Sequence, residues 1–569
     1  MRILLLLALL LPPDVLHLKD GGKIEGKIIS SDGDVYKVQV ATGTVTIAKS
    51  KVEKIDYGPS PAEELADRRA KLDRKDAKAV LELAKWAQSK GFTKEAIEIA
   101  RAGDDAACRD FAASLIEPEV RRKLDEASKA FKLGLTRRGR EIVAAIEKEY
   151  PEAKERALAL VPKETAPARP ALKQEVVDAV NAWFDKGTPI KVDAPVADFM
   201  NAIRFGAKPS GGKTGFSECK TPEGVPYLLQ VPKAYKGDRP MRLMISLHGS
   251  GGTAMMALKC WGGSFDDEED LIVAAPEGGL PGWGNSLAGH DRILGVVRDV
   301  SAHYAIDLDR VTLEGGSMGA HGSFFLTMYY PDRFAAIAPR CGSARFVNQR
   351  SKGGVPDIAA APAILDNLWR TPVYLIAGVK DGNSPIDEVR TTMRRLQGLG
   401  VPLVYKEYPE GGHEWFPAEN RDVLDFLRAH ARDPYPKRVK LTTREPAFGR
   451  CFWIEVTQAN RPLRIDITHV DMNLKEIETR SEYDKPVEVD AEADRAKNRI
   501  TLKSLYVKEL KVFLTDELLD LDKPVRITWN DSIVFEGKVE RSVQAALDDC
   551  KARRERGLPY PAAVTVKAK

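Results

Sequence analysis

The spacing of hydrophobic and polar positions changes several times along the chain, which indicates separate folding units. Residues 14–58 alternate apolar and polar side chains in short runs, and the segments 20–22 and 31–34 between them have hairpin-turn composition. They predict a small β module. Residues 60–161 change to helical spacing, clearest over 79–87 and 94–100, and predict a helical segment that includes one helix pair of the tetratricopeptide type.

A proline-rich stretch over 162–170 opens a segment, 162–196, that we expect to be an extended linker. From 197 to 435 apolar runs alternate with amphipathic segments, which predicts a mostly parallel sheet with helices on both faces, an α/β fold. The strands expected there are 242–247, 271–275, 310–314, 334–338, 373–377 and 403–408, and the helices are 292–304, 319–330, 386–399 and 421–431.

After the Pro434-Tyr435-Pro436 break the pattern returns to short strands, so 437–543 is expected to form a β-sandwich-like module. Residues 544–569 are basic and are expected to be a mobile tail. The fold class predicted is thus multidomain, with the α/β domain at its centre. A length of 569 residues fits three to four folding units.

Charge and cysteine content exclude some classes of function. Lys and Arg number 87 against 83 Asp and Glu, a formal net charge of +4, which disfavours a nucleic-acid partner. The six cysteines include no C-x-x-C pair, which argues against a ribbon-type zinc site. We therefore expect neither a metal nor a cofactor. The glycine-rich segment 207–214 resembles a phosphate loop, but the sequence after it does not predict the helix that such a loop needs.

The first residues are typical of a secretory signal. Met1-Arg2 precedes an unbroken apolar run over 3–11, followed by Pro12-Pro13. We expect residues 1–13 to be a signal peptide, and the protein to be secreted or to lie in the periplasm or envelope of a bacterium. No later stretch reaches the roughly 18 apolar residues of a membrane-spanning helix.

The candidate chemistry begins where the strand expected at 310–314 runs into Gly315-Gly316-Ser317-Met318-Gly319 and then into a helix. This G-x-S-x-G pattern between strand and helix is typical of a nucleophile elbow, in which a sharp turn presents the serine hydroxyl at the carboxyl edge of a sheet. Ser317 is the predicted nucleophile.

A serine needs an imidazole to accept its proton. His413 lies in the loop after the strand 403–408 and is the predicted general base. The other histidines after the serine have simpler explanations: His321 is within the elbow helix, His430 is in a helix where it packs or faces solvent, and His469 belongs to the C-terminal module.

Asp381 follows the strand 373–377 and completes the order Ser, Asp, His, so it is the predicted carboxylate partner. Asp387 is the alternative, although its place at a helix start also fits a partner of the helix dipole. The oxyanion donors expected are the amide of Met318 and a second amide from the glycine-rich loop 248–252, where Ser250 and Gly251 remain equal candidates.

Four segments carry a resemblance to a known family: 247–249, 281–284, 309–319 and 412–415. In this order they resemble the α/β-hydrolase superfamily, and within it the secreted bacterial esterases of the polyhydroxybutyrate-depolymerase and feruloyl or acetylxylan esterase type, which are related to prolyl-oligopeptidase-like hydrolases. The similar region is 197–435. These esterases often have histidine before the nucleophile and glycine after the elbow, where this chain has Gly316 and Ala320, so the pocket shape can differ.

The resemblance implies a serine hydrolase that cleaves carboxylic esters through an acyl-enzyme, with ester substrates that include those linked to a polysaccharide or another polymer. Two alternatives stay open. One is a prolyl-oligopeptidase-like serine peptidase, and the other is a non-catalytic scaffold that binds an envelope or polysaccharide surface. The sequence does not indicate an oligomeric state.

Overall fold

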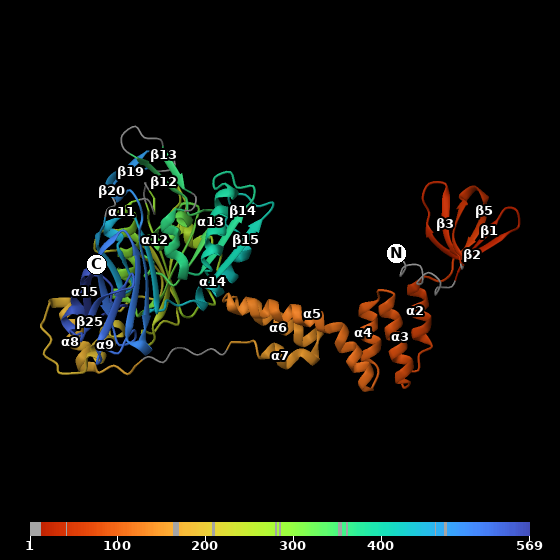
Figure 1. Cartoon of the computed structure of the whole chain (residues 1–569), viewed down its shortest axis with the longest axis horizontal. Helices are drawn as coiled ribbons and strands as arrows, with labels where there is room; N and C mark the ends of the chain where they lie inside the picture. Colours follow the sequence, from red (N-terminus) through yellow and green to blue (C-terminus); the bar gives the residue numbers. More distant parts are fainter. Residues whose placement is uncertain are drawn as a thin grey trace. The chain divides into compact units, whose positions relative to one another are not determined.

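A computed structural model of the chain describes residues 13–40, 42–162, 170–207, 211–278, 282–283, 286–350, 356–359, 362–460, 463–470 and 475–569 (Figure 1). The expected signal peptide lies outside these residues except for Pro13, as do parts of the expected linker and of the phosphate-loop-like segment. The chain divides into two compact units, Met1–Glu126 with Ile142–Ala159, and Ala127–Glu141 with Leu160–Lys569.

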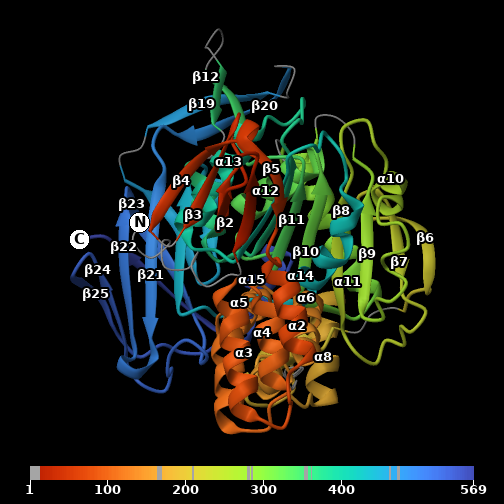
Figure 2. The ribbon, with the colours of Figure 1, turned by 90° about the vertical axis from the view of Figure 1, so that its right-hand side faces the viewer.

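The first unit contains an antiparallel sheet of order β4-β3-β2-β1-β5 (red in Figure 2), built around buried Leu16, Val38 and Ile47. Its strands are β1 (Asp14–Leu18), β2 (Lys23–Ser30), β3 (Val35–Val40), β4 (Gly43–Ala48) and β5 (Val52–Asp56), with a 3₁₀ turn, η2 (Lys49–Lys51), before β5. The helices that lie wholly or partly in this unit are α2 (Pro61–Ala70), α3 (Ala77–Ser89), α4 (Thr93–Arg101), α5 (Ala106–Lys132), α6 (Thr136–Glu149), η3 (Pro151–Ala153) and α7 (Lys154–Leu158).

The second unit is organised around an eight-stranded sheet of order β15-β14-β11-β10-β8-β9-β7-β6, part of which is labelled in this order in Figure 2. Its strands are β6 (Gly215–Lys220), β7 (Pro226–Val231), β8 (Met241–Leu247), β9 (Leu271–Pro276), β10 (Ile306–Gly316), β11 (Ala336–Arg340), β14 (Val373–Gly378) and β15 (Leu403–Tyr408). All neighbours are parallel except β6 with β7 and β7 with β9. This mixed, mostly parallel sheet is consistent with the α/β-hydrolase core.

Helices cover both faces of this sheet. Successive side chains of a strand point to opposite faces, so the contacts of neighbouring residues show which helix lies on which face. Val373 and Leu375 of β14 pack with the apolar residues of one group of helices, whereas Tyr374 between them contacts Phe426 of α14, with ring centroids 5.4 Å apart. Leu228 of β7 likewise faces α10, on the side opposite to its neighbours. The first face carries α11 (Leu287–His303), α12 (Met318–Tyr329) and α13 (Ile386–Leu399), and the second carries α10 (Ala254–Lys259) and α14 (Asn420–Ala429).

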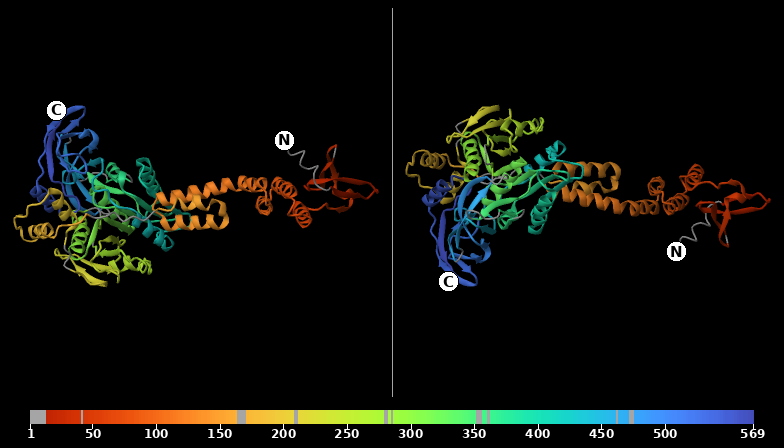
Figure 3. Two further views of the ribbon diagram at one scale, coloured as in Figure 1. Left: turned by 90° about the horizontal axis from the view of Figure 1, so that it is seen from below. Right: turned by 90° about the horizontal axis from the view of Figure 1, so that it is seen from above.

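The C-terminal part forms two sheets, β16-β21-β22-β24-β25 and β17-β18-β23-β26, around a shared apolar core, and its blue strands lie beside the central sheet in both views of Figure 3. Its strands are β16 (Arg438–Thr443), β17 (Arg450–Cys451), β18 (Ile454–Ala459), β21 (Val487–Asp494), β22 (Arg499–Leu505), β23 (Val507–Leu514), β24 (Val525–Trp529), β25 (Ser532–Gly537) and β26 (Ala562–Lys567). The described residues of the second unit also form four 3₁₀ segments, η4 (Ala363–Arg370), η5 (Pro417–Glu419), η6 (Pro446–Phe448) and η7 (Arg495–Lys497).

The expected mobile tail is wrong. Residues 544–569 belong to helix α15 (Val543–Arg553) and strand β26, which pairs with β23. Cys550 and Tyr560 are buried in the apolar cores of the unit. Lys and Arg outnumber Asp and Glu in this segment by six to three, but its apolar residues decide its structure.

The expected extended linker over 162–196 is also wrong in part. Helix α8 (Gln174–Lys186) occupies its middle, and its buried Val176, Val180 and Trp183 pack with α9 (Val196–Phe205) and α15. These residues recur at the spacing of one helical face. The proline-rich stretch ends at 170 and does not extend into this short amphipathic pattern.

A fourth sheet of order β13-β12-β19-β20 joins the two parts of the unit. β12 (Phe346–Arg350) and β13 (Pro356–Ala359) follow β11, whereas β19 (Arg464–Val470) and β20 (Glu476–Tyr483) come from the C-terminal module. Glu478 of β20 also accepts a hydrogen bond of 3.1 Å from the backbone N–H of Leu287, at the start of α11. The C-terminal module is thereby attached to the central domain through this shared four-stranded sheet and at helix α11.

A buried ion network makes a second attachment. The Glu555 carboxylate contacts Arg333 at 2.5 Å and Arg432 at 2.8 Å, and Arg553 contacts both Glu555 and Asp332, at 3.3 and 2.7 Å. Three cations and two anions from the central domain and from the end of α15 thus share one largely buried site, with side chains 2–16% exposed. Because a buried charge without a partner is strongly unfavourable, each member depends on the others.

Within the described residues, no helix combines the length and apolar character needed to cross a bilayer.

We predict that Glu555→Gln lowers the free energy of unfolding of the second unit by about 3–5 kcal/mol, because it leaves buried arginines without their shared carboxylate. Urea denaturation followed by tryptophan fluorescence measures the change. The matched control is Asp490→Asn, which breaks the largely exposed pair with Arg438 and should cost no more than about 1 kcal/mol. Equal effects of the two substitutions would contradict the role given to the network.

Candidate active site

Ser317 lies at the turn between β10 and α12, with φ 55° and ψ −116°. A non-glycine residue at positive φ is strained unless its surroundings hold it there. The Ser317 N–H donates to the carbonyl oxygen of Arg340 at 2.9 Å, and the Ser317 carbonyl accepts from the N–H of His321, which is in the first turn of α12. The serine is partly exposed at the carboxyl end of the strand.

The elbow fits against β8 only because Gly319 lacks a side chain. A Cβ atom at Gly319 would lie 2.1 Å from the carbonyl oxygen of Leu247, the last residue of β8. The loop after β8 follows the same surface, since a Cβ at Gly249 would lie 3.4 Å from the Ser317 Cβ atom. The glycine-rich loop that the sequence singles out therefore begins directly beside the serine.

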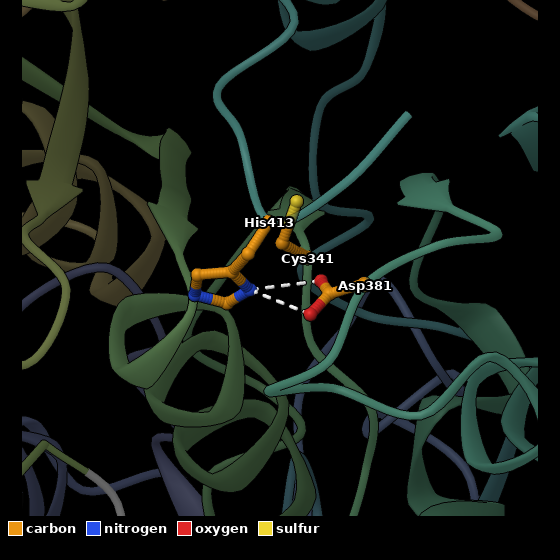
Figure 4. A group of neighbouring side chains, drawn as sticks. All are labelled: Cys341, Asp381 and His413. Carbon is orange, nitrogen blue, oxygen red and sulfur yellow. Dashed lines mark hydrogen bonds and ion pairs between the residues drawn. The ribbon is translucent and has the colours of Figure 1, made fainter. Parts of the chain in front are cut away.

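Asp381 and His413 form a hydrogen-bonded pair beyond the ends of β14 and β15 (Figure 4). The His413 Nδ1 atom lies 2.9 and 2.8 Å from the two carboxylate oxygens of Asp381. Asp381 is buried and its Oδ1 atom also accepts the backbone N–H groups of Asn383 and Ser384, both at 2.8 Å. Because the carboxylate accepts at Nδ1, that nitrogen carries the proton and the Nε2 lone pair is left available as a base.

Ser317 and His413 share no hydrogen bond among those of the described residues, but the loop of His413 lies against the elbow. The ring of Trp415 would lie 3.3 Å from a Cβ atom at Gly316. This contact gives a physical reason for glycine where the esterases that the sequence resembles often have histidine. The pair and the serine thus meet at one edge of the sheet, although a proton path from Oγ to Nε2 is not yet formed.

His321 is a second imidazole near this edge. Its Nδ1 atom lies 2.7 Å from the Ser343 carbonyl oxygen, to which it donates its proton. Burial, together with the neighbouring Arg345 and His413, lowers the pKa of His321 to about 4, against the opposing effect of the Ser343 hydrogen bond. His321 is therefore neutral above that pH and leaves His413 as the imidazole paired with a carboxylate here.

The oxyanion candidates lie at the start of α12 and in the loop after β8. Met318 follows the serine, and a Cβ atom at Gly282 would lie 3.2 Å from its sulfur atom. Ser250 and Gly251 are exposed, and Gly251 has φ 70°. In the loop after β8, the sequence predicts Ser250 or Gly251 as the second amide donor. Gly249 is the residue of this loop that lies beside the Ser317 Cβ atom.

The alternative residues lie elsewhere. The Asp387 side chain is 92% exposed in the first turn of α13, where its contact is Arg390 at 3.6 Å. His430 ends α14 and packs on Phe426, with ring centroids 4.4 Å apart. His469 is buried in β19, between Glu482 and Arg480. None of these three is placed with the elbow.

Sequence reasoning missed Arg340 and Cys341, which directly follow the expected strand 334–338. Arg340 is fully buried and donates from Nη1 to the carbonyl oxygens of Trp415 and Phe416, at 2.9 and 3.3 Å. Cys341 has φ 50°, and its sulfur atom donates to the Glu414 carbonyl oxygen at 2.8 Å. Burial raises the pKa of the Cys341 thiol to about 12. The only signal in the sequence was an arginine at the end of an apolar strand.

Among the described residues, two groups of side chains have donor atoms close enough for a metal ion, within 4.8 Å of one another. They are Cys341 with Asp381 and His413, and Glu445 with His469 and Glu482. In the first group, Nδ1 and the carboxylate already bind each other. In the second group, Arg480 occupies the centre, with contacts to Glu445 at 3.1 Å and to His469 at 2.8 Å. Both groups are therefore satisfied by protein partners.

Comparison with known proteins gives similar structures but no family. No family model matches the chain. A curated protein of Arthroderma benhamiae, described as an uncharacterized secreted protein, is 28% identical over 184 residues, which are 28% of this chain and 20% of that protein. The chain therefore matches about a fifth of the length of this relative.

Similar solved structures include esterases, serine hydrolases and dipeptidyl peptidases, and each of these covers 38% of this chain. A thermostable esterase is 24% identical with a TM-score of 0.31 over 63% of its length. A ferulic acid esterase is 16% identical with a TM-score of 0.32 over 98% of its length. The fluorophosphonate-binding serine hydrolase FphF of Staphylococcus aureus is 18% identical with a TM-score of 0.32 over 99% of its length. Likeness of this extent does not by itself assign an activity.

Glu314, three residues before Ser317, generates a prediction about pH. Burial raises the pKa of its carboxyl to about 7, against the opposing effects of Arg340, Ser246 and Trp261. The folded state therefore holds this proton more tightly than the unfolded state, whose pKa is near 4.5. The stability that this group contributes is complete below about pH 4.5 and is lost as the pH rises through 7.

We predict that the thermal midpoint of the wild type, relative to Glu314→Gln, is higher at pH 5 than at pH 8. The change across this window corresponds to about 3 kcal/mol, because each pKa unit between the two states is worth about 1.4 kcal/mol. Differential scanning calorimetry of both proteins across the window measures it. Glu445, whose pKa burial also raises to about 7, remains in both proteins and cancels in the difference. A constant difference would contradict the buried protonated carboxyl.

Proposed function

We propose that the chain is a serine hydrolase that cleaves carboxylic esters, with Ser317 as nucleophile, His413 as general base and Asp381 as its partner. The observation that carries the proposal is the Asp381–His413 pair, which leaves Nε2 available at the sheet edge where the strained Ser317 is presented. A nucleophile, a base and a residue that orients the base are the parts that acyl transfer requires.

In the proposed reaction, Ser317 Oγ attacks the ester carbonyl carbon and His413 Nε2 accepts the hydroxyl proton. Asp381 keeps the imidazole in the required tautomer and stabilises its charged form. The backbone N–H of Met318, with one from the loop 249–251, stabilises the negative oxygen that develops. His413 then gives the proton to the leaving alcohol, and water releases the acyl group by the same steps in reverse order. The missing Ser317–His413 hydrogen bond is compatible with this sequence, because such bonds often tighten only with substrate bound.

We also propose that the protein is exported. The apolar run over 3–11 supports export, as does the description of the Arthroderma benhamiae relative as secreted. Ester substrates outside the cytoplasm, including those carried by a polymer, fit this location. A peptidase and a non-catalytic scaffold are the two competing outcomes of the test.

We predict that Ser317→Ala lowers kcat on short-chain p-nitrophenyl esters by about 10⁴-fold or more, because the nucleophile is removed. Ser323→Ala is the matched control. This serine lies in α12, the helix that follows Ser317, is buried, and donates to the Gly319 carbonyl oxygen. Its kcat should stay within about threefold of the wild type. Both variants and the wild type are assayed on p-nitrophenyl esters and on peptide p-nitroanilides.

The outcomes separate the alternatives. Hydrolysis of esters that depends on Ser317 supports the proposal, whereas faster hydrolysis of the anilides favours the peptidase. If the wild type hydrolyses neither substrate, the non-catalytic binding scaffold is the alternative that remains. Ester hydrolysis that survives Ser317→Ala would move the nucleophile elsewhere.

A further inference from the structure

Arg340 is buried at a point where burial is costly. Its side chain is fully inaccessible, and its Nε and Nη2 atoms have no hydrogen-bond partner among the described residues. Its guanidinium instead lies against two indole rings, 5.0 Å from the centroid of Trp261 and 4.5 Å from that of Trp415, and these rings meet edge to face with centroids 5.9 Å apart. Removing such a charge from water disfavours folding unless good partners replace the water. Stability alone therefore does not explain why arginine stands here.

The hydrogen bonds of Arg340 all lead to the catalytic loops. Nη1 donates to the carbonyl oxygens of Trp415 and Phe416, which directly follow the segment 411–414 that carries His413. The carbonyl oxygen of Arg340 accepts the N–H of Ser317. One residue thus holds the serine elbow with its backbone and the histidine loop with its side chain.

The neighbours of Arg340 extend this connection. The indole Nε1 of Trp415 donates to Asn420 at 3.0 Å, and Asn420 donates to the carbonyl oxygens of Cys260 and Trp261 at 3.2 and 3.3 Å. The ring of Trp415 also lies against Gly316. Hydrogen bonds therefore connect the segments of the two indoles that contact the guanidinium, and the ring of Trp415 also lies against the elbow.

Two carboxyls face the guanidinium, but neither is within 4 Å to form an ion pair with it. Glu314 lies in β10 and is bonded to Ser246 at 2.8 Å, while Glu419 accepts from Tyr374 and from Tyr408. They act on Arg340 through space. The guanidinium thus remains directed at the loop carbonyls rather than at a carboxylate.

We propose that Arg340 is a positioning residue, which sets the distance and orientation between Ser317 and His413 by holding both loops. This inference rests on the proposed function. Arginine is required because its planar group can lie against aromatic rings while it donates to two carbonyl oxygens, which the ammonium group of lysine cannot reproduce.

The test compares Arg340→Lys and Arg340→Met with Arg432→Lys. Arg432 is the matched control, because it is also a buried arginine of this domain but bonds to Asp309, Asp332 and Glu555, away from the catalytic loops. Misplacement of a reacting group by about 1 Å can cost about 100-fold in rate. We expect Arg340→Lys to lose about 10- to 100-fold in kcat with KM within about threefold, and Arg340→Met to lose more. Arg432→Lys should lower the thermal midpoint but keep kcat.

A spectroscopic readout that does not need turnover is the downfield proton resonance of His413 Nδ1–H, assigned by its absence in His413→Gln. We expect this resonance to shift or broaden in Arg340→Lys and to stay unchanged in Arg432→Lys. Trp415→Phe loosens the same site while keeping the arginine. If the Arg340 variants do not fold, a smaller loss of kcat with a shifted resonance in Trp415→Phe supports the proposal.

Ser317→Ala is measured in the same series. Loss of activity in Ser317→Ala, together with wild-type kcat and an unchanged resonance in Arg340→Lys, overturns the positioning role and leaves the proposed function intact. If Arg340→Lys does not fold, unchanged kcat and resonance in Trp415→Phe overturn it in the same way. A wild type without activity that depends on Ser317 overturns the proposed function and this inference together.

Discussion

The conformation of Ser317 depends on a close backbone contact, where the start of α12 lies against the end of β8. Gly319 leaves no room for a side chain beside the Leu247 carbonyl oxygen, so the helix begins immediately after the strand and the turn is forced to positive φ at the serine. Strain of this kind persists only where the surroundings determine the backbone. Here they are β8, β11 through the Arg340 carbonyl, and α12 itself. The glycine-rich loop after β8 and the Trp415 ring lie against the same elbow.

The features that the sequence predicts well are those with a local cause. The strand before Ser317, the helix after it and the alternation of strands and helices over 197–435 follow from periodicity and from glycine spacing. The pairing of Asp381 with His413 followed from their places after two strands, because carboxyl ends of parallel strands meet at one edge of a sheet. Asp387, His430 and His469 were set aside for local reasons, and each lies in the environment expected of it.

The features that the sequence did not predict depend on contacts between distant segments. Helix α8 and the ordered C-terminal segment are stabilised by packing on each other, and composition alone suggested a linker and a tail. Arg340 reads as the polar end of an apolar strand, and only the tertiary structure places two indoles and the histidine loop around it. The ion network around Glu555 joins residues more than 200 positions apart. No local pattern encodes such partners.

The most direct measurement for the central claim is peptide mapping by mass spectrometry after reaction of the whole protein with a fluorophosphonate. The account predicts one adduct per chain, on the peptide that contains Ser317, because only a serine activated by a neighbouring base reacts readily with such a reagent. It also predicts that His413→Gln, in which the base is removed, is not labelled. Absence of an adduct in the wild type, or an adduct on another serine, would contradict the account.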